Sequence, residues 1–270
     1  MFIALLFMPL VVYGNYLFWE GSGYDRFLKL AYMADIIYLG EVHDSEEVHE
    51  LQIRLIRDLY FRGFDLLILM EQFQQPYQEF LDQYIEGEIS EEEMLKGTRY
   101  SELWGYDPEL YAGLWRFARV AKIPLYALNI PSSVLIDVRR KGIFNVKSGY
   151  LPPFIVDFSC EHRRYLEEIF RDHPGSHDRL FDIQLAWDNG MAYRVAKLFA
   201  GNPAKKVVVI VGSGHVWRGY GIPERVSRFL GDVRQLVLFT ENGNFYFLFS
   251  RDFSRENSSA NSIVEPNCNP

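Results

Sequence analysis

The sequence predicts an α/β fold with a mostly parallel central sheet, helices on both faces, an antiparallel edge hairpin and a helical insertion. The main observation is a set of short apolar runs, each ending in glycine or followed directly by a polar residue: residues 35–40, 65–70, 124–128 and 207–212. Continuous apolar runs of this length are typical of strands buried on both faces, as in parallel sheets. Segments with helical spacing separate the runs, and a later Asn-Gly pair is typical of a hairpin turn.

An amphipathic segment, residues 45–62, joins the first two strands, and Asp44 or Ser45 can cap it while Gly63 can end it. This arrangement predicts a βαβ unit with a right-handed crossover. The next connection, residues 72–123, is far longer than one helix needs. We therefore expect a helical insertion there, with helices over residues 77–84, 90–95 and 108–121.

The rest of the chain predicts three more helices, over residues 159–171, 177–200 and 223–230, and two more strands, over residues 235–239 and 245–250. A Pro152-Pro153 loop precedes the first of these helices. The two strands flank Asn242-Gly243, which suits a hairpin turn because both central residues need positive φ. We expect a single domain over residues 15–253.

The two ends of the chain differ from this pattern. Residues 1–14 are apolar and uncharged, and they are too few to span a bilayer, which takes about 20. They fit the apolar region of a secretory signal peptide, which predicts export to the periplasm or cell envelope; a buried first strand or helix is the alternative. Residues 254–270 are polar and aperiodic, and we expect a disordered tail there.

Composition excludes several classes of protein. Lys+Arg number 28 against 36 Asp+Glu, a net charge of −8, which argues against binding to nucleic acid and against attachment to anionic lipid by charge. Two cysteines cannot form a disulfide scaffold or a Cys-rich metal site. The aromatic share of 16% provides many stacking surfaces, but it also suits an ordinary core.

Chemically capable residues follow the predicted strands. Glu41 and His43 come after the first strand, Glu71 after the second and His215 after the fourth. Because ligands bind outside the carboxyl ends of strands in open parallel sheets, these four residues predict a site that could hold a divalent metal ion. Any one of them could instead cap a helix or meet solvent. His49, on the first helix, could face this site or solvent.

Other features leave two interpretations open. Residues 99–119 carry six aromatic residues: Tyr100, Trp104, Tyr106, Tyr111, Trp115 and Phe117. At helical spacing this stripe predicts core packing, or else a groove for a flat apolar ligand such as haem, for which Tyr is an axial ligand type. His162, His173 and His177 lie in or beside polar sequence, and we expect them to be solvated.

Six motifs resemble, in the same order, those of the ChaN-like haem-binding uptake proteins of the Tiki superfamily. They are GEVHD at 40–44, MEQF at 70–73, WGYDPELY at 104–111, ALNIP at 127–131, QLAWDNGMA at 184–192 and GSGHVWRGYGIPERV at 212–226. The resemblance covers residues 34–230 or thereabouts. It implies an α/β fold and a haem-binding role in bacterial iron acquisition at the cell envelope. Haem held between two subunits, as a homodimer, is a further implication.

The resemblance also implies site residues. The polar centre would be Glu41, His43, Glu71 and His215, with Arg225 as a partner for an anion or a transition state. Family members are often lipoproteins, which implies peripheral membrane association, although no lipobox cysteine follows the apolar N-terminal run.

The motifs therefore favour one function and leave an alternative. The first is a haem-binding protein, with Tyr106 or Tyr111 as candidate ligands and Trp104 and His49 as further haem contacts. The second is a metal-dependent hydrolase of the Tiki or erythromycin-esterase type that uses the Glu/His centre.

Overall fold

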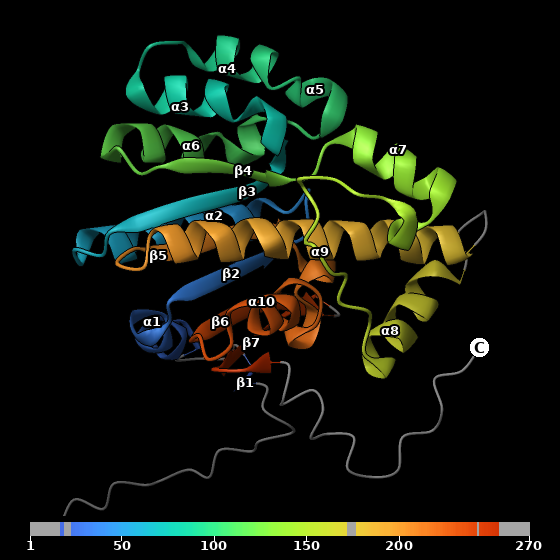
Figure 1. Cartoon of the computed structure of the whole chain (residues 1–270). Helices are drawn as coiled ribbons and strands as arrows, with labels where there is room; N and C mark the ends of the chain where they lie inside the picture. The colour runs from blue at the N-terminus through green and yellow to red at the C-terminus, as the bar shows by residue number, and fades with distance from the viewer. Residues whose placement is uncertain (1–16, 19–22, 172–176, 242, 254–270) are drawn as a thin grey trace, which may run out of the picture.

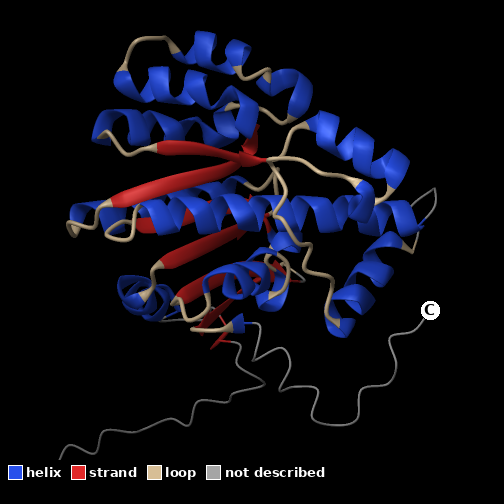
Figure 2. Ribbon diagram, viewed as in Figure 1, coloured by secondary structure: helices blue, strands red, loops and turns tan. Residues whose placement is uncertain are grey.

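The computed structural model describes residues 17–18, 23–171, 177–241 and 243–253. Within them, the central element is a seven-stranded sheet in the order β1-β7-β6-β2-β5-β3-β4, with helices on both sides (Figure 2). The predicted signal peptide over residues 1–14 and the predicted tail over residues 254–270 lie outside the described residues.

The strands are β1 (Leu17–Phe18), β2 (Ile36–Glu41), β3 (Leu66–Gln74), β4 (Leu125–Asn129), β5 (Lys206–Gly212), β6 (Gln235–Glu241) and β7 (Asn244–Ser250). Strands β2 to β6 pair in parallel, whereas β7 is antiparallel to β6 and to β1. The mostly parallel sheet with an antiparallel hairpin is thus confirmed. Gly243 has a φ of 74°, as the turn requires.

The helices are α1 (Gly23–Met33), α2 (Glu46–Phe61), α3 (Gln78–Glu86), α4 (Glu91–Gly97), α5 (Tyr100–Leu103), α6 (Glu109–Ala121), α7 (Ser132–Lys141), α8 (Cys160–Phe170), α9 (His177–Gly201) and α10 (Ile222–Leu230). Short 3₁₀ turns are η1 (Gln75–Tyr77), η2 (Ile143–Asn145), η3 (Ser213–His215) and η4 (Trp217–Gly219). The insertion between β3 and β4 is helical, as predicted, and consists of η1 and α3 to α6.

Alternation along the strands separates two hydrophobic cores. In β2, Ile37 and Leu39 pack in the core that α1 to α6 cover, whereas Ile36 and Tyr38 pack in the core under α9 and α10. Figure 1 shows α9 in front of the sheet and α2 behind it. Because successive side chains of a strand point to opposite faces, this division continues to the strand ends, where the polar residues lie.

Helices α1, α5 and α7 were not predicted, and α7 shows why. It buries only Val134 and Val138, an i, i+4 pair that makes too narrow a stripe for a periodicity argument. Its boundary signals are nevertheless present in the sequence. Pro131 precedes the helix, basic residues fill its last turn, and Gly142 ends it with a φ of 79°.

The prediction that His162 is solvated is wrong, because α8 packs this side chain inward. His162 is fully buried, with its ring stacked on Tyr220 at 5.7 Å and at the edge of Phe158 at 5.0 Å. Burial lowers the pKa of His162 to about 3, so the imidazole is neutral at physiological pH. His173 and the side chain of His177 lie outside the described residues.

Candidate functional site

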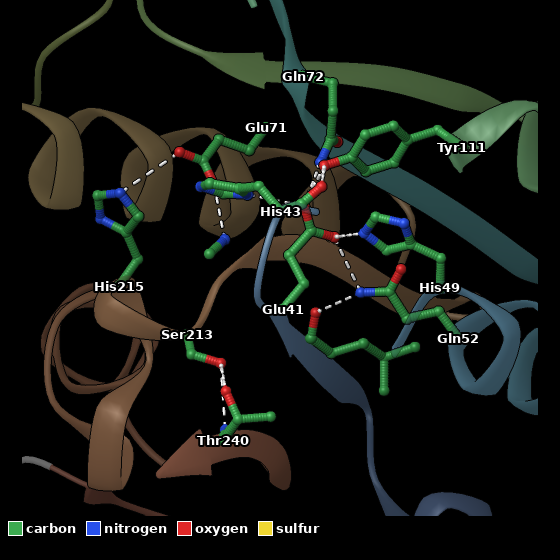
Figure 3. A network of polar contacts seen from close by, with 12 residues as sticks. Glu41, His43, His49, Gln52, Glu71, Gln72, Tyr111, Ser213, His215 and Thr240 are labelled. Atoms are coloured by element: carbon green, nitrogen blue, oxygen red, sulfur yellow. Dashed lines mark hydrogen bonds and ion pairs between the residues drawn. The ribbon is translucent and has the colours of Figure 1, made fainter. Parts of the chain in front are cut away.

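The structure brings Glu41, His43, Glu71 and His215 together at the C-terminal edge of the sheet (Figure 3). The strand register accounts for this: Glu41 of β2 lies opposite Gly212 of β5, and β3 flanks β5 on its other side. The carboxyl ends of β2, β5 and β3 therefore share one stretch of the edge.

Glu41 occupies the face of the sheet that carries α2 and α6. Its Oε1 accepts hydrogen bonds from Tyr111 Oη at 2.7 Å and Gln72 Nε2 at 2.9 Å. Its Oε2 accepts one from Gln52 Nε2 at 3.0 Å, and His49 Nε2 lies 3.7 Å from the same oxygen. His49 therefore faces the site and not solvent. The carboxylate of Glu41 is buried and fully surrounded by donors, which fixes its position.

Glu71 occupies the opposite face, the one that carries α9. It directly precedes Gln72 in β3, so alternation sends the two side chains to different sides of the sheet. The backbone N–H of Gly212 donates to Glu71 Oε2 at 2.7 Å, and His215 Nε2 lies 3.4 Å from Oε1. Burial opposes ionisation of Glu71, but the charge and hydrogen bond of His215 outweigh it and lower the pKa of Glu71.

His43 lies between these two halves, and Gly212 makes room for it. A Cβ at Gly212 would lie 2.9 Å from His43 Cε1 and 3.5 Å from Glu71 Oε2, so only glycine allows the imidazole to approach this closely. His43 Nδ1 pairs with Glu41 Oε1 at 2.9 Å. Burial disfavours the charged imidazole, but the hydrogen bond with Glu41 and the charge of Glu71 outweigh it and raise the pKa of His43.

His215 is enclosed by carboxylates. Its Nδ1 lies 2.7 Å from Asp188 Oδ1 on α9, while its Nε2 faces Glu71. Burial opposes the charged form, but the charge of Glu71 and the hydrogen bond with Asp188 raise the pKa of His215 to about 10. The edge of the sheet thus carries two imidazoles in different settings, one partly open and one enclosed.

The structure does not bring Arg225 to this centre. Arg225 is fully buried, and its Nη1 donates to Gly221 O at 2.9 Å and lies 3.8 Å from Asp188 Oδ2. A guanidinium in this position supports Asp188 and lies behind His215. It therefore has no access to a ligand at the sheet edge.

The aromatic residues predicted to contact haem differ in how far their side chains are exposed to solvent. Tyr106 is 40% exposed, and its ring lies 5.3 Å from that of His43; the ring of Trp104 lies 4.7 Å from His43. Tyr111 is buried, and its hydroxyl is engaged by Glu41. Of the two candidate tyrosines, only Tyr106 presents its side chain to solvent.

The metal hypothesis finds no support in this geometry. The part of the chain that the structure describes contains no group of three or more His, Cys, Asp or Glu side chains that could hold a metal ion. Glu41, His43, Glu71 and His215 instead form ion pairs, Glu41 with His43 and Glu71 with His215. The carboxylate oxygens of Glu41 and Glu71 accept hydrogen bonds from protein donors.

Sequence reasoning missed the residues that hold these pairs in place, chiefly Gln52, Gln72, Gln184 and Asp188. Gln72 lies in the motif MEQF, and Gln184 and Asp188 lie four residues apart in QLAWDNGMA. The i, i+4 spacing of Gln184 and Asp188 on the predicted helix over residues 177–200 could have identified the second pair.

Comparison with known proteins identifies the family. The profile of the family described as haem-binding uptake, Tiki superfamily, ChaN matches residues 27–226. The chain belongs to this family. No protein with a curated description matches the sequence significantly.

Solved structures of the ChaN family and beyond share the fold. ChaN of Campylobacter jejuni, described as binding haem cofacially, aligns with a TM-score of 0.62 and 18% identity over 84% of this chain and 91% of that chain. The C-terminal region of Pasteurella multocida toxin aligns with a TM-score of 0.51 and 13% identity over 87% of this chain and 27% of that chain. These likenesses confirm the α/β fold. None of the described helices is both long and apolar enough to cross a membrane.

Proposed function

We propose that this ChaN family member binds haem at the C-terminal edge of its sheet and takes part in haem or iron uptake at the bacterial envelope. The observation that carries the proposal is the match of the haem-binding family over residues 27–226. Haem is then the cargo of the protein, and the chain has to supply a flat apolar contact and a ligand for iron.

The residues beside the polar centre fit such a cargo. Trp104 and Tyr106 lie 5.7 Å apart by ring centroid, and both contact His43, so an indole, a phenol and an imidazole share one partly exposed surface. Phenolate and imidazole are both axial ligands of haem iron in proteins. Because the hydroxyl of Tyr111 already donates to Glu41, we assign the ligand to Tyr106.

A haemin titration tests the assignment. Haemin added to the full chain should give a saturable Soret shift, and Tyr106→Phe should weaken binding roughly tenfold or more, since each factor of ten is about 1.4 kcal/mol. Tyr77→Phe, on the same insertion but without ring contact to His43 among the described residues, should bind as the wild type does. Light scattering on the same samples shows whether two copies share haem. Binding no tighter than to an unrelated protein contradicts the proposal.

The second candidate, hydrolysis of an ester or peptide, is favoured by the setting of His43. Glu41 orients this imidazole through Nδ1, and its side chain is 28% exposed, so Nε2 is available to take a proton from water. This is the arrangement of a general base, which typically contributes 10²–10⁴-fold in rate.

The second candidate function predicts a specific dependence of the hydrolysis rate on pH. The neutral imidazole is the active form, and the pKa of His43 is raised above 6.5, so hydrolysis of a p-nitrophenyl ester should increase as pH rises through a value above 6.5. Glu41→Gln should move that midpoint to lower pH, and His43→Gln should abolish the reaction. Hydrolysis that survives His43→Gln rules out this mechanism.

A further inference from the structure

The two imidazoles at the sheet edge differ in how many of their nitrogens are held. His215 has both nitrogens beside carboxylate oxygens, Asp188 Oδ1 at 2.7 Å and Glu71 Oε1 at 3.4 Å, and its side chain is 12% exposed. His43 has only Nδ1 held, by Glu41, and no described residue forms a hydrogen bond with its Nε2. The open position at this site therefore belongs to His43.

Asp188 is the group that sets His215 apart. It is fully buried in α9, and its position is fixed from two further sides. Gln184 Nε2, one helical turn earlier, donates to Asp188 Oδ1 at 3.1 Å. Arg225 Nη1 of α10 lies 3.8 Å from Asp188 Oδ2 and is itself tied to Gly221 O. The carboxylate is therefore held in one orientation before any ligand arrives.

We propose that Asp188 is a positioning residue that holds His215 against Glu71. Because His49 is buried, His43 is then the one partly exposed imidazole at this edge that exchanges protons with, or coordinates, a bound ligand. The residues that hold His215 form the row Glu71–His215–Asp188–Arg225, in which neighbouring charged groups lie 3.4, 2.7 and 3.8 Å apart. The same division of roles applies to a haem or to a hydrolysed ester, so the inference goes beyond the proposed function.

Chemical labelling read out for each histidine tests whether Asp188 holds His215, and it needs neither a bound ligand nor an activity assay. Diethyl pyrocarbonate transfers an ethoxyformyl group to an imidazole nitrogen that is free and accessible. In the full-length protein, His43 should be labelled roughly ten- to hundredfold faster than His215, the factor expected when a charge-assisted hydrogen bond has to open first. Peptide mass spectrometry reads both rates in one sample.

The Asp188→Asn variant should raise the labelling rate of His215 roughly tenfold and leave that of His43 within about twofold, since Asp188 pairs with His215 and not with His43. Asp188→Glu keeps the carboxylate and should restore part of the protection, which a merely structural role of Asp188 does not predict. The matched control is Asp182→Asn, a half-buried acidic residue of the same helix that does not contact His215. It should leave both rates unchanged.

Equal labelling of His43 and His215 in the wild type overturns the proposal, and so does a folded Asp188→Asn protein in which His215 stays protected. Should Asp188→Asn fail to fold, the wild-type rates decide alone. A second readout on the wild type is the Nδ1 proton of His215, assigned by its loss in His215→Gln. This proton should resonate far downfield, as expected for a short hydrogen bond to a carboxylate. Neither readout involves haem, so failure of the haem proposal leaves this test intact.

Discussion

Replacing Trp115 by Ala is expected to lower the free energy of unfolding by about 3–5 kcal/mol, the usual cost of removing a buried Trp. Trp115 is completely buried in α6 and lies at the centre of an aromatic cluster. Its ring centroid is 5.9 Å from both Phe73 and Tyr100, and 6.4 Å from Tyr111, on which it stacks. The cavity left by the substitution would open directly beneath Tyr111.

Urea unfolding followed by circular dichroism measures this effect. Val120→Ala is the matched control, because Val120 belongs to the same helix but is 84% exposed and should change stability by no more than about 0.5 kcal/mol. Since Tyr111 donates to Glu41, Trp115→Ala should also loosen the polar centre. A loss below about 1 kcal/mol would mean that the helical insertion contributes little to the core.

The same cluster shows what the sequence could predict and what it could not. The aromatic stripe of residues 99–119 left core packing and a ligand groove as alternatives. The structure divides the stripe between them: Trp115, Tyr111 and Tyr100 are core, while Tyr106 is exposed. Periodicity indicates that a helix has an apolar face, but it does not indicate which residues at the end of that face extend past the neighbouring elements.

The strands could be predicted because their signal is local. Strands β2, β3 and β5 are buried on both faces, and burial on both faces leaves a continuous apolar run in the sequence, such as Val207 to Val211 in β5. The edge strand β4 shows the same run, although its Tyr126 is half-buried. Strand β1 has two residues, too few for any pattern, and pairs with β7.

The candidate site was predicted as a set of residues but not as an arrangement. Strand ends indicated where Glu41 and Glu71 would lie, yet the two carboxylates lie on opposite faces of the sheet. The face that a residue occupies depends on its position in the alternation of its strand. A continuous apolar run does not show on which face of the sheet its last residue lies. Asp188 lies in the middle of a 25-residue helix, and only the packing of α9 against β5 brings it to His215.

Replacing Glu41 by Leu is expected to lower the free energy of unfolding by about 3–5 kcal/mol, the cost of removing one partner from a buried ion pair. The substitution leaves Gln72 Nε2 and His43 Nδ1 without their acceptor. Tyr111 Oη retains only a 3.2 Å contact with His43 O. Unsatisfied donors of this kind cost about 1–3 kcal/mol each when they stay buried.

Glu41→Gln serves as the matched control, because it keeps the shape and one acceptor oxygen while it removes the charge. We expect a loss of roughly 1–3 kcal/mol for this variant. Tyr111→Phe supplies the decisive comparison: in a double-mutant cycle with Glu41→Leu, the combined loss should fall short of the sum by about 0.5–3 kcal/mol, as for residues in direct contact. Strict additivity would show that the 2.7 Å hydrogen bond between Tyr111 and Glu41 contributes nothing to stability. The position of Glu41 would then depend on Gln52, Gln72 and His43.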